Sequence, residues 1–122
     1  MSLLAIVVED SPTIRDNLAG ALEELVGVRV IAFAETAGQA IEDLADHAAA
    51  WQLLIVDLFL KEGSGLTVLR ACQGRAAHQR VVVLTNYATN EMRQRCKALG
   101  ADGMFDKSTE LEAFFDFCRT AG

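Results

Sequence analysis

The sequence predicts one α/β domain in which a five-stranded parallel sheet is covered by helices on both faces. Short apolar runs alternate with stretches whose apolar residues recur at helical spacing, which is typical of alternating strands and amphipathic helices. The run Leu53–Val56 is aliphatic throughout, as expected for a strand buried on both faces of a parallel sheet. The chain has 122 residues, enough to bury one substantial core, so we expect residues 1–122 to form a single domain.

The first strand and helix are predicted from an apolar run and a helix-start signal. Leu3–Val8 is aliphatic and short, which indicates a strand. Ser11 and Pro12 then predict a helix start, because serine can cap a backbone N–H and proline has none to satisfy. Gly27 is expected to end this helix. The predicted apolar stripe consists of Ile14, Leu18, Ala21, Leu22 and Leu25.

The middle of the chain repeats this alternation. Val28–Ala34 is rich in β-branched residues and predicts the second strand. Thr36 is expected to cap a helix over residues 37–48. The third strand, Leu53–Val56, leads through a glycine-bearing loop to a helix predicted over residues 66–76.

The last third of the chain predicts two more strand and helix pairs. Residues 80–84 predict the fourth strand, which ends at Thr85. A helix is expected over residues 89–99, closed by Gly100. Residues 101–106 predict a short fifth strand. Ser108 is expected to cap the final helix. One side of that helix is predicted to carry Leu111, Phe114, Phe115 and Cys118.

Composition excludes several classes of function. The net charge of −6 would repel a phosphate backbone, so this domain is not expected to bind nucleic acid directly. Each apolar stretch is shorter than the roughly 18 residues of a membrane span, and no signal segment opens the chain, so we expect a cytoplasmic protein without membrane contact. The cysteines lack the spacing of a zinc site, and we expect reduced thiols at Cys72, Cys96 and Cys118.

Four of the predicted strands end in residues that carry chemistry. Glu9 and Asp10 follow the first strand, Asp57 the third, Thr85 ends the fourth, and Lys107 follows the fifth. Because the carboxyl ends of parallel strands meet at one edge of a sheet, we expect these side chains to converge. Clustered carboxylates favour a cation such as Mg²⁺, and a lysine and a hydroxyl beside them suit a transferred phosphoryl group.

These residues resemble the signature of the response-regulator receiver domain of two-component signalling. The segments 63–66, 84–88 and 99–103 also resemble family segments, so the likeness covers essentially the whole chain. It implies a doubly wound, chemotaxis-regulator-like fold with the flavodoxin-like strand order 2-1-3-4-5.

The resemblance also implies a role for each residue. Asp57 would accept a phosphoryl group from a phosphohistidine on a sensor histidine kinase or a phosphotransfer protein, in a self-catalysed transfer followed by autodephosphorylation, so the domain is not expected to be an enzyme in the usual sense. Lys107 would pair with the phosphoryl oxygens, and the Thr85 hydroxyl would swing to bond one of them. Mg²⁺ would be held by Glu9, Asp10, Asp57 and the backbone carbonyl of Phe59.

The sequence departs from the family pattern near the predicted switch. Met104 stands where an aromatic switch residue is usual. Ser108 replaces a common cis proline, so a trans Lys107–Ser108 bond is expected, since a non-proline cis bond costs about 2.5–4 kcal/mol. Phe59 and Tyr87 occupy positions that tune attack of water on the acyl phosphate, and two bulky rings predict a long-lived phosphorylated state. The resemblance places dimer or target contacts on the fourth helix, fifth strand and fifth helix.

Three other interpretations of these residues are a phosphatase, a cofactor binder and a receiver-like module that only binds. A phosphatase of the haloacid dehalogenase type would need a second aspartate where Phe59 stands, and a flavodoxin-like cofactor binder would need a glycine- and hydroxyl-rich loop where Glu9 and Asp10 stand. A receiver-like module that works by binding alone, without phosphate, is the remaining alternative. Whether the chain is a stand-alone regulator or the receiver of a longer protein stays open.

Overall fold

A computed structural model describes residues 3–121 and contains five strands and five helices in alternation. The strands are β1 (Leu3–Val8), β2 (Val28–Ala34), β3 (Leu53–Val56), β4 (Arg80–Thr85) and β5 (Gly103–Asp106). The helices are α1 (Pro12–Val26), α2 (Ala37–Asp46), α3 (Gly65–Ala71), α4 (Asn90–Ala98) and α5 (Leu111–Thr120). All strand pairs are parallel and the order is β2-β1-β3-β4-β5, which confirms the predicted doubly wound sheet.

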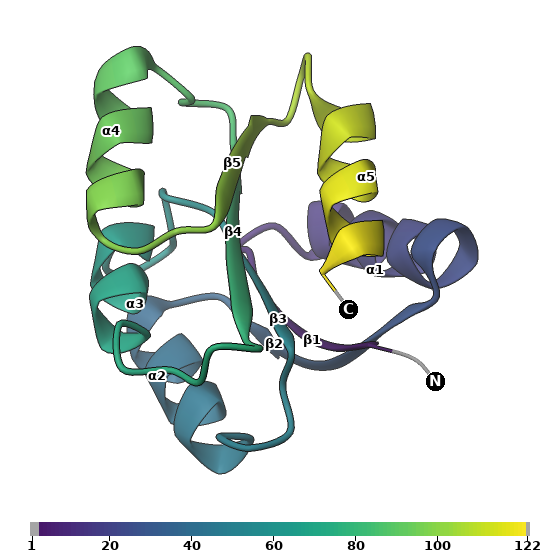
Figure 1. Ribbon diagram of the computed structural model, residues 1–122, viewed down its shortest axis with the longest axis horizontal. Coiled ribbons are helices and arrows are strands. Elements are labelled where there is room, and N and C mark those ends of the chain that lie inside the picture. The colour runs from purple at the N-terminus through teal and green to yellow at the C-terminus, as the bar shows by residue number, and fades with distance from the viewer. Residues whose placement is uncertain (1–2, 122) are drawn as a thin grey trace.

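The sheet separates two helical layers, with α1 and α5 on one face and α2, α3 and α4 on the other (Figure 1). Alternate residues of the central strands serve the two layers, so that Ile6 packs toward one face while Val7 packs toward the other. Leu53 to Val56 are all buried, as a strand covered on both faces requires. No described helix is long and apolar enough to cross a membrane.

The predicted starts of α1 and α2 and the predicted end of α1 are confirmed. The Ser11 hydroxyl accepts the N–H of Ile14, and Pro12 is the first residue of α1. Gly27 ends α1 with a φ of 71°, a left-handed conformation that glycine adopts without strain. The Thr36 hydroxyl accepts the N–H of Gln39 at the start of α2.

Several predicted details are wrong. Helix α3 ends at Ala71 rather than residue 76, because the Arg75 guanidinium bonds the carbonyls of Cys72 and Gln79 and holds this segment as a turn. Helix α2 ends at Asp46, two residues before the predicted end, and β5 begins at Gly103 rather than residue 101. The ends of the α1 stripe, Ile14 and Leu25, are exposed.

Ser108 does not cap the last helix. Helix α5 begins after Glu110, and the turn that precedes it is closed by Asp106, whose Oδ1 accepts the N–H groups of Ser108 and Thr109 at 2.7 and 3.2 Å. The Asp106 carbonyl also accepts the Glu110 N–H at 2.9 Å, a group that a Ser108 cap would have served, so the aspartate at the end of β5 closes this turn instead of the serine. The expected trans Lys107–Ser108 bond is confirmed, since the described residues contain no cis peptide bond.

The three cysteines are reduced and buried, as predicted. Burial raises the pKa of the Cys72 thiol to about 11 and that of Cys118 to about 12, and it also raises the pKa of Cys96. Thiols with such pKa values carry little thiolate at neutral pH, so these side chains are packing groups rather than reactive ones.

Candidate functional site

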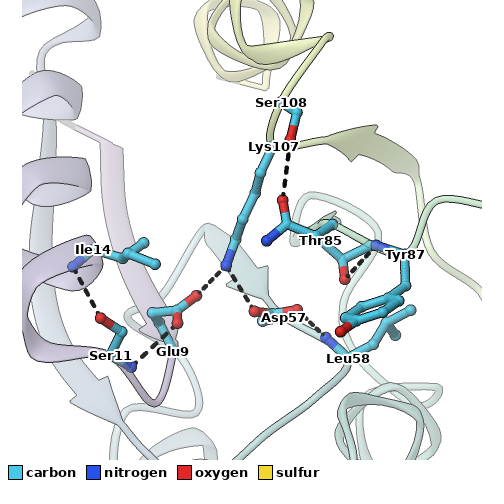
Figure 2. Close-up of polar contacts among 10 residues, drawn as sticks. Glu9, Ser11, Ile14, Asp57, Leu58, Thr85, Tyr87, Lys107 and Ser108 are labelled. Atoms are coloured by element: carbon cyan, nitrogen blue, oxygen red, sulfur yellow. Dashed lines mark hydrogen bonds and ion pairs between the residues drawn. The ribbon is translucent and has the colours of Figure 1, made fainter.

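The carboxyl ends of four strands bring four of the predicted residues to one edge of the sheet (Figure 2). Glu9 directly follows β1, Asp57 directly follows β3, Thr85 is the last residue of β4 and Lys107 directly follows β5. The parallel arrangement therefore produces the predicted convergence from segments up to 98 residues apart in sequence.

One ammonium group joins the two carboxylates. Lys107 Nζ lies 2.7 Å from Glu9 Oε2 and 2.7 Å from Asp57 Oδ2. The side chains of Glu9, Asp57 and Lys107 are only 4, 10 and 13% exposed, so these contacts are shielded from solvent. Like charges this close would repel, and the lysine compensates them.

Backbone groups hold the second oxygen of each carboxylate. Asp57 Oδ1 accepts the N–H of Leu58 at 2.7 Å, and Glu9 Oε1 accepts the N–H of Ser11 at 3.2 Å. The main-chain N–H of Lys107 donates to the Thr85 carbonyl at 3.0 Å. Each carboxylate is thus held at both oxygens: one accepts a main-chain N–H, and the other contacts the Lys107 ammonium.

Burial and ion pairing act in opposite directions on this cluster. Burial raises the pKa of Glu9 above its usual value, and the hydrogen bond from Lys107 offsets only part of that effect. Burial by itself would lower the pKa of Lys107, but hydrogen bonds to Asp57 and Glu9 outweigh it and raise the pKa. The lysine is therefore firmly protonated, and its charge is always available at this edge.

A glycine allows the loop after Asp57 to fold back against the strand. A Cβ atom at Gly65 would lie 2.2 Å from the Asp57 carbonyl oxygen and 2.9 Å from Leu58 Cα, so no larger residue fits without a shift of the backbone. The Gly65 N–H donates to the Leu58 carbonyl at 2.9 Å. The start of α3 is thereby pressed against the residue that carries the central carboxylate.

Two aromatic rings stand at the rim beside Asp57. Phe59 and Tyr87 have ring centroids 4.3 Å apart at an interplanar angle of 52°, and they are 54 and 55% exposed. The Tyr87 N–H donates to Thr85 Oγ1 at 3.3 Å, so the fully buried threonine is tied to the same loop. Figure 2 shows Tyr87 next to Asp57 and Thr85.

The predicted metal ligands are only partly assembled. Glu9 and Asp57 face a common point, but the Lys107 ammonium lies there. Within residues 3–121, no three His, Cys, Asp or Glu side chains are grouped closely enough to hold a metal ion. Oxygen donors of this kind nevertheless fit Mg²⁺. The ligand set that also includes Asp10 and the Phe59 carbonyl stays a prediction.

Met104, the predicted replacement for an aromatic switch, lies on β5, half-buried against the layer of α2, α3 and α4. Its carbonyl accepts a hydrogen bond from Arg93 Nη1 at 3.0 Å. Sequence reasoning missed Arg93, because an arginine on a polar helix such as α4 is normally solvated and its partners here are main-chain carbonyls and a distant carboxylate.

Of two surface pockets, one reaches this edge of the sheet and the other does not. The larger, about 580 Å³, is lined by Trp51, Cys72 and His78 at the opposite end of the sheet and has no part in the cluster. A groove of about 360 Å³ between α1 and α5 reaches Lys107 and is lined mainly by apolar residues such as Leu111.

Comparison with known proteins agrees with this geometry. A family model described as "Response regulator receiver domain" matches residues 5–118. The photosynthetic apparatus regulatory protein RegA of Rhodobacter capsulatus is 30% identical over 105 residues, which cover 86% of this chain and 55% of RegA, so the chain spans about half the length of that relative.

Solved structures show the same fold. The response regulator domain of Thermotoga maritima CheB superposes with a TM-score of 0.86 at 16% identity, covering 99% of this chain and 96% of that one. The Mn²⁺-bound form of the response regulator Rcp1 gives a TM-score of 0.76 at 20% identity, covering 96 and 89%. From the family match and the RegA relationship, the chain belongs to the response regulator receiver domain family of two-component systems.

Proposed function

We propose that Asp57 is the phosphoacceptor of this receiver domain and takes its phosphoryl group from a phosphohistidine of a sensor histidine kinase or phosphotransfer protein. The observation that carries the proposal is the placement of the Asp57 carboxylate, held by the Leu58 N–H on one oxygen and by Lys107 on the other. In the transfer, a carboxylate oxygen forms a bond to phosphorus while the phosphorus–nitrogen bond breaks, and its electron pair stays on the imidazole.

Lys107 and Thr85 would stabilise the transferred group. Phosphoryl transfer depends chiefly on positioning and charge neutralisation, and a protonated lysine at 2.7 Å from Asp57 supplies both. The Thr85 hydroxyl, which accepts the Tyr87 N–H in this structure, lies in the adjacent strand and would turn to donate to a phosphoryl oxygen.

The donor set is compatible with Mg²⁺ held by Glu9, Asp10, Asp57 and the Phe59 carbonyl. Support comes from two carboxylates that already share one cation, and from the related fold of Rcp1 with bound Mn²⁺. Mg²⁺, when bound, supplies positive charge to the phosphoryl oxygens. Because Lys107 bonds Glu9 as well as Asp57, the lysine and the ion compete for Glu9.

The signal would leave the site through the elements that carry Thr85 and Lys107. Phosphorylation adds negative charge at Asp57, which attracts the Thr85 hydroxyl and the Lys107 ammonium. This attraction shifts the equilibrium between two arrangements of the β4–α4 loop and the turn before α5. We place the response on the surface of α4, β5 and α5, where a second copy or a target would bind.

Binding of beryllofluoride, a mimic of the aspartyl phosphate, tests the proposal. Amide resonances of Thr85 and Lys107 are followed by NMR with and without Mg²⁺; Trp51 is a poor fluorescent reporter, since it is buried just before β3, at the end of that strand remote from Asp57. We expect a response in the native chain only with Mg²⁺, none in Asp57→Asn, and a native response in the control Asp46→Asn, at the exposed end of α2.

A native chain that does not respond, or an Asp57→Asn variant that responds equally, would overturn the phosphoacceptor assignment. That result would leave the alternative of a receiver-like module that acts by binding alone.

A further inference from the structure

The guanidinium of Arg93, on α4, bonds three segments: the loop after Thr85, β5 and the residue before α5. Its Nε donates to the carbonyl of Ala88 at 3.1 Å, in the loop after Thr85. Its Nη1 donates to the carbonyl of Met104 at 3.0 Å, in β5. Its Nη2 donates to Oε1 of Glu110, directly before α5. The planar fork of an arginine suits such a set of acceptors, whereas a lysine offers a single charged nitrogen.

Glu110 extends this hydrogen-bond network to the turn that contains Lys107. The same Oε1 accepts the N–H of Asp106 at 3.0 Å, and Asp106 Oδ1 in turn accepts the N–H groups of Ser108 and Thr109. The two residues that flank Lys107 in the chain are therefore fixed by one continuous chain of hydrogen bonds that begins at α4.

The turn depends on these bonds for its shape. The Lys107–Ser108 bond is trans and carries no ring, so nothing covalent restricts the backbone where the lysine leaves β5. The lysine side chain must nevertheless place its nitrogen within 2.7 Å of two carboxylates at once. A flexible side chain keeps such a position only if its Cα is held, and the carboxylates of Asp106 and Glu110 hold it from both sides.

We propose that Arg93 and Glu110 are positioning residues for Lys107: the ion pair fixes the turn that aims the ammonium at Asp57, and it ties that turn to the loop that follows Thr85. This inference rests on the proposed phosphoacceptor role of Asp57. Neither residue touches the Asp57 site, and both side chains are about a third exposed. The ion pair therefore fixes the shape of the turn but adds little to the free energy of unfolding.

The charge state of Glu110 is consistent with this role. Its hydrogen bond with Arg93, followed by the one from the Asp106 N–H, holds the pKa of the Glu110 carboxyl below its usual range. The pair is therefore fully charged at neutral pH, where a signalling domain works.

The test compares two affinities in Arg93→Gln and Glu110→Ala. We expect the half-saturating concentration of beryllofluoride at fixed Mg²⁺ to rise about tenfold, as for a weakened charge-assisted hydrogen bond to the bound group. Affinity for Mg²⁺ alone should not fall, because Lys107 competes with the ion for Glu9 rather than binding it. A general loosening of the fold would weaken both.

Matched variants sharpen the comparison. Arg80→Gln removes another arginine–carboxylate contact, with Asp102 at the opposite end of the sheet, and should leave both affinities at native values. Glu110→Gln keeps an oxygen for the Asp106 N–H and for Arg93 but loses the ion pair, so it should recover only part of the beryllofluoride affinity that Glu110→Ala loses. Arg93→Lys should recover less, because a single charged nitrogen cannot reach all three acceptors.

A second readout does not need the phosphate mimic. The side-chain ammonium resonance of Lys107 should shift in Arg93→Gln without any ligand, and stay in place in Arg80→Gln. Unchanged beryllofluoride affinity in both Arg93→Gln and Glu110→Ala, or an equal loss of Mg²⁺ affinity, would overturn the positioning role. A native chain that fails to bind beryllofluoride contradicts the proposed function instead, while an unmoved Lys107 resonance contradicts this inference alone.

Discussion

Lys107 Nζ contacts Asp57 Oδ2 at 2.7 Å, and its second contact, Glu9 Oε2, lies at the same distance. A single cation thus compensates two buried carboxylates that come from different strands. Removing it would leave two negative charges without a partner in a site from which water is largely excluded.

Replacing Lys107 by methionine should lower the free energy of unfolding by about 3 kcal/mol at pH 7 without divalent ions, since breaking a buried pair leaves uncompensated charge. Urea unfolding measures the change. Added Mg²⁺ should restore part of the loss by replacing the missing cation. The exposed pair of Arg119 and Asp116 provides the control, and Arg119→Gln should cost less than about 1 kcal/mol. An equal cost in both variants would contradict the importance of burial.

Gly65 should not tolerate a methyl group. A Cβ there would lie 2.2 Å from the Asp57 carbonyl oxygen, so Gly65→Ala must move the loop or the end of β3 and should cost about 1–3 kcal/mol. The shift in urea midpoint measures this cost. Gly74→Ala is the matched control, because a Cβ at Gly74 meets no atom within 4 Å. Similar midpoints for the two variants would refute the packing argument.

The strand ends and the early helix starts were predictable because their signals are local. An aliphatic run followed by a carboxylate defines the end of β3 and places Asp57. Ser11 and Thr36 cap helices through bonds to residues three positions onward, which a sequence pattern contains in full. The convergence of Glu9 and Lys107 then follows from the rule that parallel strands end at one edge.

The turn before α5 was not predictable in this way. Ser108, Asp106 and Glu110 are all capable of capping, and the structure uses Asp106 together with Glu110, whose partner Arg93 lies 17 positions away in the sequence. No spacing rule links an α4 arginine to the carbonyl of Met104. The Lys107 contacts also could not be foreseen in detail, since the ammonium lies where a metal ion was expected.

Phe59 and Tyr87 should slow the loss of phosphate from Asp57. The two rings contact each other, and Figure 2 shows Tyr87 beside Asp57, so the pair would restrict the approach of a water molecule to an acyl phosphate there. Phe59→Ala and Tyr87→Ala should each shorten the lifetime of the phosphorylated protein several-fold, measured by release of labelled phosphate. Tyr87→Phe keeps the ring and should retain the native lifetime. Native loss within seconds at room temperature would refute the shielding role.

The contribution of Glu110 to stability should disappear in acid. Its pKa is lower in the folded protein than the ordinary 4.5, chiefly through the hydrogen bond from Arg93, so its stabilisation is complete above 4.5 and is lost as the pH falls through the folded value. The difference in unfolding free energy between the native chain and Glu110→Gln should be constant from neutral pH down to about 5.5 and shrink below 4.5.

Repeating the comparison in an Arg93→Gln background identifies the cause of that pH dependence. With the guanidinium removed, only the Asp106 N–H still favours the charged form of Glu110, so the acid loss should become much smaller. Urea unfolding of the native chain, Glu110→Gln, Arg93→Gln and the double variant between pH 3.5 and 7 gives the required double-mutant cycle. An acid loss of the same size in both backgrounds would mean that Arg93 does not set the pKa of Glu110, and the ion pair could not then be what holds the turn at Lys107.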